Sequence, residues 1–185
     1  PLACIAHLLL DPPLVSAGDS VLVTGPGPMG LLAAQVVRSM GAQVMISGLR
    51  ADESRLAIAS SLGFETTDSA VESGYDVALE CSGSAGGARA ALEAVRKAGR
   101  YVSVGIHGRD ITIPFDLVLY KELTVTSGFA ATSQSWQRAM RLLEERLVKV
   151  GPLISSVEPL TAWDAVIAAL QAGDGMKIIF DPRIN

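Results

Sequence analysis

The sequence lacks any cluster of lysine and arginine residues, and its formal net charge is −4. Nucleic acid binding needs a concentrated basic surface, so this composition argues against a nucleic acid partner. No apolar run approaches the ~20 residues needed to span a bilayer, and no signal peptide pattern leads the chain. We therefore expect neither a nucleic acid nor a membrane partner.

Cysteine is scarce, since the chain contains only Cys4 and Cys81. Two cysteines so far apart in sequence indicate no disulfide framework, which suits a reducing compartment and predicts a cytoplasmic setting. Cys4 and His7 are three residues apart and could supply half a metal site on one helix face, but no second pair completes it. We expect no metal site in this chain.

Three catalytic signatures are also missing. None of Tyr75, Tyr101 and Tyr120 has a lysine four residues on, as a short-chain dehydrogenase requires. Ser84 has serine rather than glycine two residues before it, so it forms no nucleophile elbow. No Walker lysine follows the glycine-rich loop, which argues against nucleotide hydrolysis.

The sequence does contain a glycine-rich turn between a strand pattern and a helix pattern. The apolar run Val21–Val23 leads into Gly25, Gly27 and Gly30, and an apolar helix pattern follows. The first glycine permits a tight turn, the second lets a pyrophosphate approach the backbone, and the third lets helix and strand pack closely. Pro28 suits the first helical turn. This arrangement predicts a dinucleotide phosphate cradle at a helix N-terminus.

Short β-branched runs alternate with helical patterns along the rest of the chain. Further strands are expected at residues 43–47, 64–67, 75–80, 101–105 and 123–127. Helices are expected from Asp52 to Gly63, from about Gly86 to Ala98, and around Trp136 to Leu143. This alternation predicts an α/β fold, a doubly wound six-stranded parallel sheet of the Rossmann type.

The rhythm changes beyond about residue 130. Strand patterns at 153–157 and 177–180 flank a helix pattern at 161–172, and no second glycine fingerprint occurs. These elements either flank the sheet or belong to a separate domain.

The chain resembles the medium-chain zinc-dependent dehydrogenases, in particular the threonine and sorbitol dehydrogenase branch. The resemblance covers nearly the whole chain and rests on five segments: Pro1–Ala3, Gly18–Gly30, Glu80–Gly83, Lys121–Leu123 and Lys177–Pro182. It implies a nicotinamide-dinucleotide-binding part of an oxidoreductase that transfers hydride between an alcohol and NAD(P). The substrate would be a small alcohol or carbonyl compound.

The resemblance also implies a domain division. Residues 1–12 would be a helix linking from an N-terminal catalytic domain, 13–130 the dinucleotide-binding domain, and 131–185 a segment returning to complete the catalytic domain. Zinc is expected only in that catalytic domain, which by this resemblance would lie outside the present chain. Since the chain starts at Pro1, we expect it to be part of a longer protein, inactive alone. The family's habit of associating through the cofactor domain implies a homodimer or homotetramer.

No catalytic residue is assigned to this chain. His107 follows the fifth strand, at the edge where ligands bind, and a general acid or base role for it is conceivable. The resemblance, however, implies that this stretch forms the wall beside the nicotinamide. The cofactor contacts expected from the fingerprint and the resemblance are Thr24, Gly25, Gly27, Pro28, Met29, Gly30, Gly48, Arg50, Cys81, Ser82, Gly83, Val104, Gly105, Ile106, Ser127, Gly128 and Phe129.

Cofactor choice depends on the end of the second strand, where NAD-binding members carry an acidic residue. Gly48 aligns with that acid, and nearby Arg50 could pair with a 2′-phosphate. The sequence thus favours NADP over NAD, although Asp52 and Glu53 lie close enough to restore the acidity. A non-catalytic NAD(P)-binding or sensing module, or a zinc-free quinone or enoyl reductase relative, is the alternative to an alcohol dehydrogenase.

Overall fold

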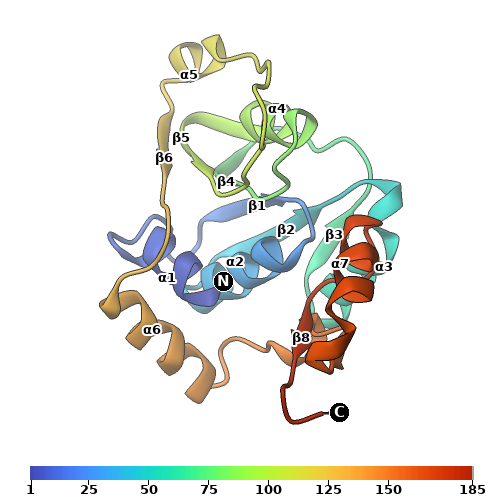
Figure 1. Ribbon diagram of the computed structural model, residues 1–185. Coiled ribbons are helices and arrows are strands. Elements are labelled where there is room, and N and C mark those ends of the chain that lie inside the picture. The colour runs from blue at the N-terminus through green and yellow to red at the C-terminus, as the bar shows by residue number, and fades with distance from the viewer. Residues whose placement is uncertain (185) are drawn as a thin grey trace. The chain divides into compact units, whose positions relative to one another are not determined.

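A computed structural model describes residues 1–184 (Figure 1). The chain forms two compact units, Pro1–Val148 and Lys149–Asn185. No helix among the described residues is long and apolar enough to cross a membrane.

Six parallel strands form the sheet of the first unit. They are β1 (Ser20–Thr24), β2 (Gln43–Ser47), β3 (Glu65–Thr67), β4 (Tyr75–Glu80), β5 (Val95–Ser103) and β6 (Thr124–Ser127). Their order across the sheet is β3-β2-β1-β4-β5-β6. The order reverses beside β1, which is the doubly wound arrangement, so the predicted Rossmann-type α/β fold is confirmed.

Helices cover both faces of this sheet. They are α1 (Leu2–Leu10), α2 (Pro28–Ser39), α3 (Glu53–Ser61), α4 (Ala85–Ala94), α5 (Asp116–Tyr120) and α6 (Ser133–Glu144). The α2 crossover runs from β1 to β2 and the α4 crossover runs from β4 to β5, in opposite directions along the sheet. Since such crossovers are right-handed, α2 and α4 lie on opposite faces.

The central strands are apolar at successive positions because both of their faces are buried in the core. Val21, Leu22 and Val23 of β1 have no exposed surface, nor do Val77 and Leu79 of β4. A strand covered on both faces buries every residue rather than alternate ones. Side chains on both faces of β1 therefore stabilise the sheet through burial, at about 1.5–3 kcal/mol for each fully buried large apolar group.

The last helix of the first unit packs against the first. Six residues of α1 are buried, among them Ile5 and Leu9, and this helix contacts both α2 and α6. Because α6 packs on α1, the boundary between the two compact units follows Val148. The expected division at residue 130 concerns the parts of a longer protein and stays a prediction.

The helix expected to reach Ala98 ends earlier, and this expectation was wrong. Helix α4 ends at Ala94, and Val95 already belongs to β5, where it pairs with Tyr75. The Lys121 ammonium donates hydrogen bonds to the carbonyl oxygens of Leu92, Glu93 and Val95, at 3.0, 2.7 and 2.8 Å. It thereby satisfies helix-end carbonyls that would otherwise lack a partner.

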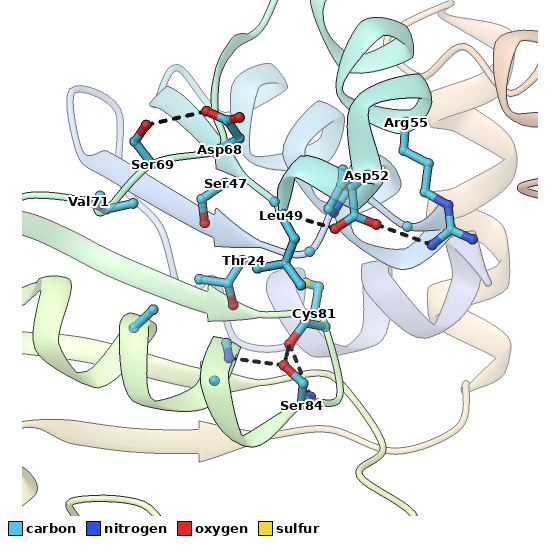
Figure 2. A pocket seen from close by; sticks show the side chains of 18 of the residues that line it. Thr24, Ser47, Leu49, Asp52, Arg55, Asp68, Ser69, Val71, Cys81 and Ser84 are labelled. Atoms are coloured by element: carbon cyan, nitrogen blue, oxygen red, sulfur yellow. Dashed lines mark hydrogen bonds and ion pairs between the residues drawn. The ribbon is translucent and has the colours of Figure 1, made fainter. Parts of the chain in front are cut away.

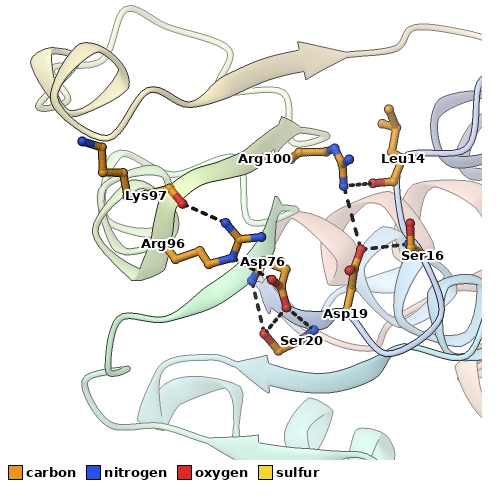
Figure 3. A network of polar contacts seen from close by, with 8 residues as sticks. All are labelled: Leu14, Ser16, Asp19, Ser20, Asp76, Arg96, Lys97 and Arg100. Carbon is orange, nitrogen blue, oxygen red and sulfur yellow. Dashed lines mark hydrogen bonds and ion pairs between the residues drawn. The ribbon is translucent and has the colours of Figure 1, made fainter.

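A polar network joins strand starts at the opposite edge of the sheet from the glycine turn (Figure 3). Asp76 of β4 accepts hydrogen bonds from the Ser20 amide and hydroxyl, both at 2.8 Å, and from Arg96 Nε at 2.7 Å. These hydrogen bonds lower the pKa of Asp76 to about 2, and the bond from the Ser20 amide has the largest effect. The carboxylate thus ties β1 to the start of β5.

The second unit contains a short parallel pair of strands and one helix. The strands are β7 (Ser156–Glu158) and β8 (Ile178–Phe180), and α7 spans Trp163–Gln171. The strand expected at 153–157 starts at Ser156 instead, because Gly151–Leu153 forms a 3₁₀ turn whose Leu153 amide bonds to the Val150 carbonyl. The predicted helix and the last strand are present.

Candidate functional site

A groove of about 500 Å³ lies at the carboxyl ends of β1, β2, β3 and β4 (Figure 2). Its lining comes from the turn after β1 (Gly25–Gly27), the segment after β2 (Gly48 and Leu49), the residues after β3 (Asp68–Val71) and the start of α4 (Gly86 and Gly87). The groove is therefore at the point where the strand order reverses, which is where open α/β sheets bind ligands.

The three fingerprint glycines meet different surroundings. Gly25 has a φ of +96°, and a Cβ there would lie 2.7 Å from Ser82 Cα. A Cβ on Gly30 would lie 2.1 Å from the carbonyl oxygen of Gly25, so α2 and the turn can approach only without one. A Cβ on Gly27 would meet nothing within 4 Å. Gly25 and Gly30 are thus needed by the fold, whereas Gly27 borders open space.

That open space faces the start of α2. Gly27 is the N-cap residue, no side chain caps the helix, and Pro28 occupies the first turn. The first amides of a helix lack internal partners and carry the positive end of its dipole. Gly27 lines the groove, so an anion there would meet the helix start without a Cβ in the way.

A buried hydroxyl adds a second unsatisfied group. Thr24, at the end of β1, lines the groove, and its Oγ1 has no hydrogen-bond partner among the described residues. Buried polar atoms nearly always have a partner, so an orphaned one indicates that a ligand or water completes the site.

The segment after β2 brings an acidic and a basic side chain, Asp52 and Arg55, into the groove lining. Asp52 Oδ2 accepts a hydrogen bond from the Leu49 amide at 2.9 Å, and its Oδ1 lies 3.8 Å from Arg55 Nη1 (Figure 2). Both side chains line the groove beside Gly48. The Arg50 side chain is 95% exposed, lies 3.8 Å from Asp68, and is outside the lining. The sequence indicated Arg50 and missed Arg55.

The loop between β4 and α4 forms the opposite wall. Cys81 and Ser82 line the groove, and Ser84 caps α4 by accepting a hydrogen bond from the Gly87 amide at 3.0 Å. Burial, together with the charge of Glu80, raises the pKa of the Cys81 thiol. The thiol is therefore neutral and a weak nucleophile near pH 7.

Glu80 itself was missed. It ends β4 with no exposed surface, and it holds the loop through hydrogen bonds to Ser82 and Gly83. The available signal was a charged residue that continues the buried run Val77–Leu79, because such a residue requires partners.

The structure brings six of the expected contact residues into the groove lining: Thr24, Gly25, Gly27, Gly48, Cys81 and Ser82. The others are outside this lining: Pro28, Met29, Gly30, Arg50, Gly83, Val104, Gly105, Ile106, Ser127, Gly128 and Phe129. Six of these residues form two short segments at the carboxyl ends of the neighbouring strands β5 and β6. Residues 104–106 follow β5, and residues 127–129 lie at the end of β6, where a Cβ on Gly128 would touch Leu8.

No group of three or more histidine, cysteine or acidic residues that could hold a metal occurs among residues 1–184. Cys4 and His7 are both partly buried on α1. His107 Nε2 lies 3.9 Å from Glu80 Oε2. The described residues do not fit a zinc site.

Comparisons with known proteins agree with this geometry. Residues 28–145 match the family model described as zinc-binding dehydrogenase, and the chain belongs to that family. Among individual relatives, a sorbitol dehydrogenase of Halalkalibacterium halodurans is 34% identical over 98% of the chain and 57% of its own length. An L-threonine 3-dehydrogenase of Colwellia psychrerythraea is 28% identical over 98% of the chain and 56% of its length.

Solved structures show the same arrangement. A protein described as a zinc-binding dehydrogenase, from Sinorhizobium meliloti 1021 and bound to NADP, has a TM-score of 0.86 at 27% identity, over 98% of this chain and 57% of that one. Acetophenone reductase from Geotrichum candidum, in complex with NAD, has a TM-score of 0.87 over 100% and 54%, and at 19% identity it shows the fold alone. The chain spans little more than half the length of these relatives.

Proposed function

We propose that this chain is the nicotinamide-dinucleotide-binding part of an alcohol, polyol or threonine-type dehydrogenase. The observation that carries the proposal is the open cradle at Gly27, beside an uncapped helix start and the unsatisfied hydroxyl of Thr24. These features fit a pyrophosphate, which brings negative charge and hydrogen-bond acceptors to the helix start. The NADP-bound relative of the same family supports this assignment.

In this proposal each wall of the groove has a separate task. The amides at the start of α2 bind the pyrophosphate, and the segment after β2 binds the adenosine ribose. Residues 104–106 and 127–129, at the carboxyl ends of β5 and β6, orient the nicotinamide half. The bound dinucleotide supplies the hydride chemistry, while this chain binds and orients it.

We propose NADP(H) as the preferred cofactor. Gly48 leaves no carboxylate at the end of β2 to repel a 2′-phosphate. The Asp52 carboxylate is already engaged by the Leu49 amide and by Arg55, so it is less available to a ribose hydroxyl. Arg55 lies within the groove lining, and Arg50 lies outside it, 3.8 Å from the lining residue Asp68; in this proposal both supply positive charge for the phosphate.

We further propose that zinc and the substrate pocket belong to a part of the protein outside these residues, for which residues 131–185 provide the returning segment. The relatives are nearly twice as long, and two of them are named for polyol and amino acid substrates. Zinc there would polarise the oxygen of a small alcohol or carbonyl substrate. A cytoplasmic setting is also part of the proposal.

A homodimer or homotetramer completes the proposal. Strand β6 is one of the two edge strands of the sheet, and Val125 on it is 43% exposed. Phe115, Leu119 and Tyr120, which lie on or beside the neighbouring helix α5, are also exposed. An unpaired edge with apolar neighbours is suited to pairing with a second copy.

Calorimetric titration of the purified protein with NADPH and NADH tests the proposal. We expect saturable binding of both, with NADPH tighter. Alcohol-dependent reduction of NADP⁺ or NAD⁺ by the full-length protein would separate the dehydrogenase from a binding or sensing module. Absence of binding to either dinucleotide would refute the proposed function.

A further inference from the structure

One buried acidic residue, Glu80, has no role in the proposed function. Glu80 is the last residue of β4, it has no exposed surface, and it does not line the groove. An ionised carboxylate is costly to bury unless hydrogen bonds compensate it. Its contacts therefore indicate what the charge stabilises.

One carboxylate oxygen holds the β4–α4 loop. Glu80 Oε1 accepts hydrogen bonds from the Ser82 amide at 2.8 Å, the Ser82 hydroxyl at 2.6 Å and the Gly83 amide at 3.0 Å. Hydrogen bonds to a charged acceptor are shorter and stronger than those to a neutral one. This oxygen thus fixes both the backbone and the side chain of the loop.

The charge also sets the direction of a chain of hydroxyl bonds. Since the Ser82 hydroxyl donates to Glu80, Ser82 Oγ can only accept from the Ser84 hydroxyl, 2.9 Å away, and it also accepts from the Ser84 amide at 3.1 Å. Ser84 Oγ in turn accepts from the Gly87 amide at the start of α4 (Figure 2). Ser82, Ser84 and Gly87 all line the groove.

We call this chain of hydrogen bonds, from Gly87 through Ser84 and Ser82 to Glu80, the relay. Close contacts around two glycines leave the relay little room to move. A Cβ on Gly87 would lie 2.1 Å from Ser82 Oγ, and a Cβ on Gly105 would lie 2.6 Å from Glu80 Oε2. Glycine at 87 is therefore required by the position of the Ser82 hydroxyl. Glycine at 105 is required first by the Gly83 nitrogen, 2.3 Å from that Cβ, and then by Glu80. The segment after β5 and the loop after β4 are held against the same carboxylate.

The second oxygen lies in a closed environment. Glu80 Oε2 is buried without a hydrogen-bond partner among the described residues, and His107 Nε2 is 3.9 Å away. The other titratable neighbours are the thiol of Cys81 and the phenol of Tyr101. Burial raises the pKa of each, and the charge of Glu80 raises both further. Both groups are neutral near pH 7.

We propose that Glu80 is a positioning residue for dinucleotide binding, which acts through Ser82 and Ser84 to fix the wall of the groove between β4 and α4. The inference rests on the proposed function. The carboxylate is not part of the groove lining, so its effect on affinity is transmitted by the relay.

A double-mutant cycle on the full-length protein tests this. We expect Glu80→Gln and Ser82→Ala each to weaken binding of NADPH and NADH about tenfold, the equivalent of one charge-assisted hydrogen bond. The double variant should bind within about twofold of Ser82→Ala, because both changes break the same relay. Glu93→Gln changes an exposed glutamate on α4 whose carboxylate lies 3.5 Å from Arg89; it is the matched control and should leave the Kd unchanged.

Two results would overturn the inference. One is a double variant whose loss equals the product of the single losses. The other is a Glu80→Gln protein with a lower Tm but a Kd within twofold of native, which would mean a role in stability alone. Native protein that binds no dinucleotide would instead refute the proposed function.

A fallback variant covers the case in which Glu80→Gln does not fold. Ser84→Ala breaks the relay at its solvent end. Weakening of dinucleotide binding by severalfold supports the relay, and a native Kd for Ser84→Ala contradicts it.

Discussion

The Asp76 network makes a quantitative prediction about stability against pH (Figure 3). In the folded chain the pKa of Asp76 is lowered from 3.8 to about 2, first by the Ser20 amide and then by Arg96. A difference of this size is equivalent to about 2.4 kcal/mol of unfolding free energy. The side chain is 27% exposed, so solvent screening reduces the contribution to about 1–2 kcal/mol.

The sign follows from the direction of the change. Because the folded pKa lies below the unfolded one, the stabilisation is complete above about pH 5 and is lost as the pH falls through 4 toward 2. We expect Asp76→Asn to lower the free energy of unfolding by about 1–2 kcal/mol at pH 7. The difference between variant and native protein should shrink steadily below pH 4.

Urea denaturation at pH 7, 4 and 2.5 measures both effects. Asp110→Asn, a change at an exposed aspartate whose charge is lost in the same way, is the matched control and should alter stability little at any of these pH values. A destabilisation by Asp76→Asn that is the same at pH 7 and pH 2.5 would refute the electrostatic explanation. It would indicate that the substitution acts through packing or uncharged hydrogen bonds and not through the charge.

Three other predictions concern the cofactor, the helix end and the sheet edge. Arg55→Gln should weaken NADPH binding about tenfold in calorimetry and leave NADH within about twofold, since one charge-assisted bond is lost; equal losses would exclude a phosphate role. Lys121→Met should lower stability by about 1–2 kcal/mol in thermal unfolding, as helix carbonyls lose their donor; an unchanged Tm would contradict this capping role. Val125→Lys should shift the mass in light scattering toward monomer, because charges oppose edge pairing; an unchanged oligomer would remove β6 from the interface.

Much of the fold could be predicted because its determinants are local. A few consecutive residues are enough to recognise the buried runs of β1 and β4 and the glycine turn before α2. The end of α4 could not be predicted in this way. It depends on Lys121, whose contacts with the helix carbonyls cross 26 to 29 residues of sequence.

The candidate site likewise contains residues that local sequence predicts and residues that it does not. The glycine-rich turn is enough to predict the glycines and Thr24 as lining residues. The choice between Arg50 and Arg55 depends instead on the 3₁₀ turn Arg50–Asp52, which leaves the Arg50 side chain in solvent and Arg55 in the groove lining. Glu80 was hidden for a related reason. Its importance depends on how the following loop folds back onto it, and strand periodicity does not encode that path.

The central claim is that the start of α2 holds the pyrophosphate of a nicotinamide dinucleotide across open space at Gly27. Titration of Gly27→Ala with NADPH and NADH tests it most directly, because a Cβ there meets no protein atom and its φ of −76° suits alanine. We predict a Tm within a few degrees of native and a loss of dinucleotide affinity of a hundredfold or more. Native affinity in Gly27→Ala would contradict the account.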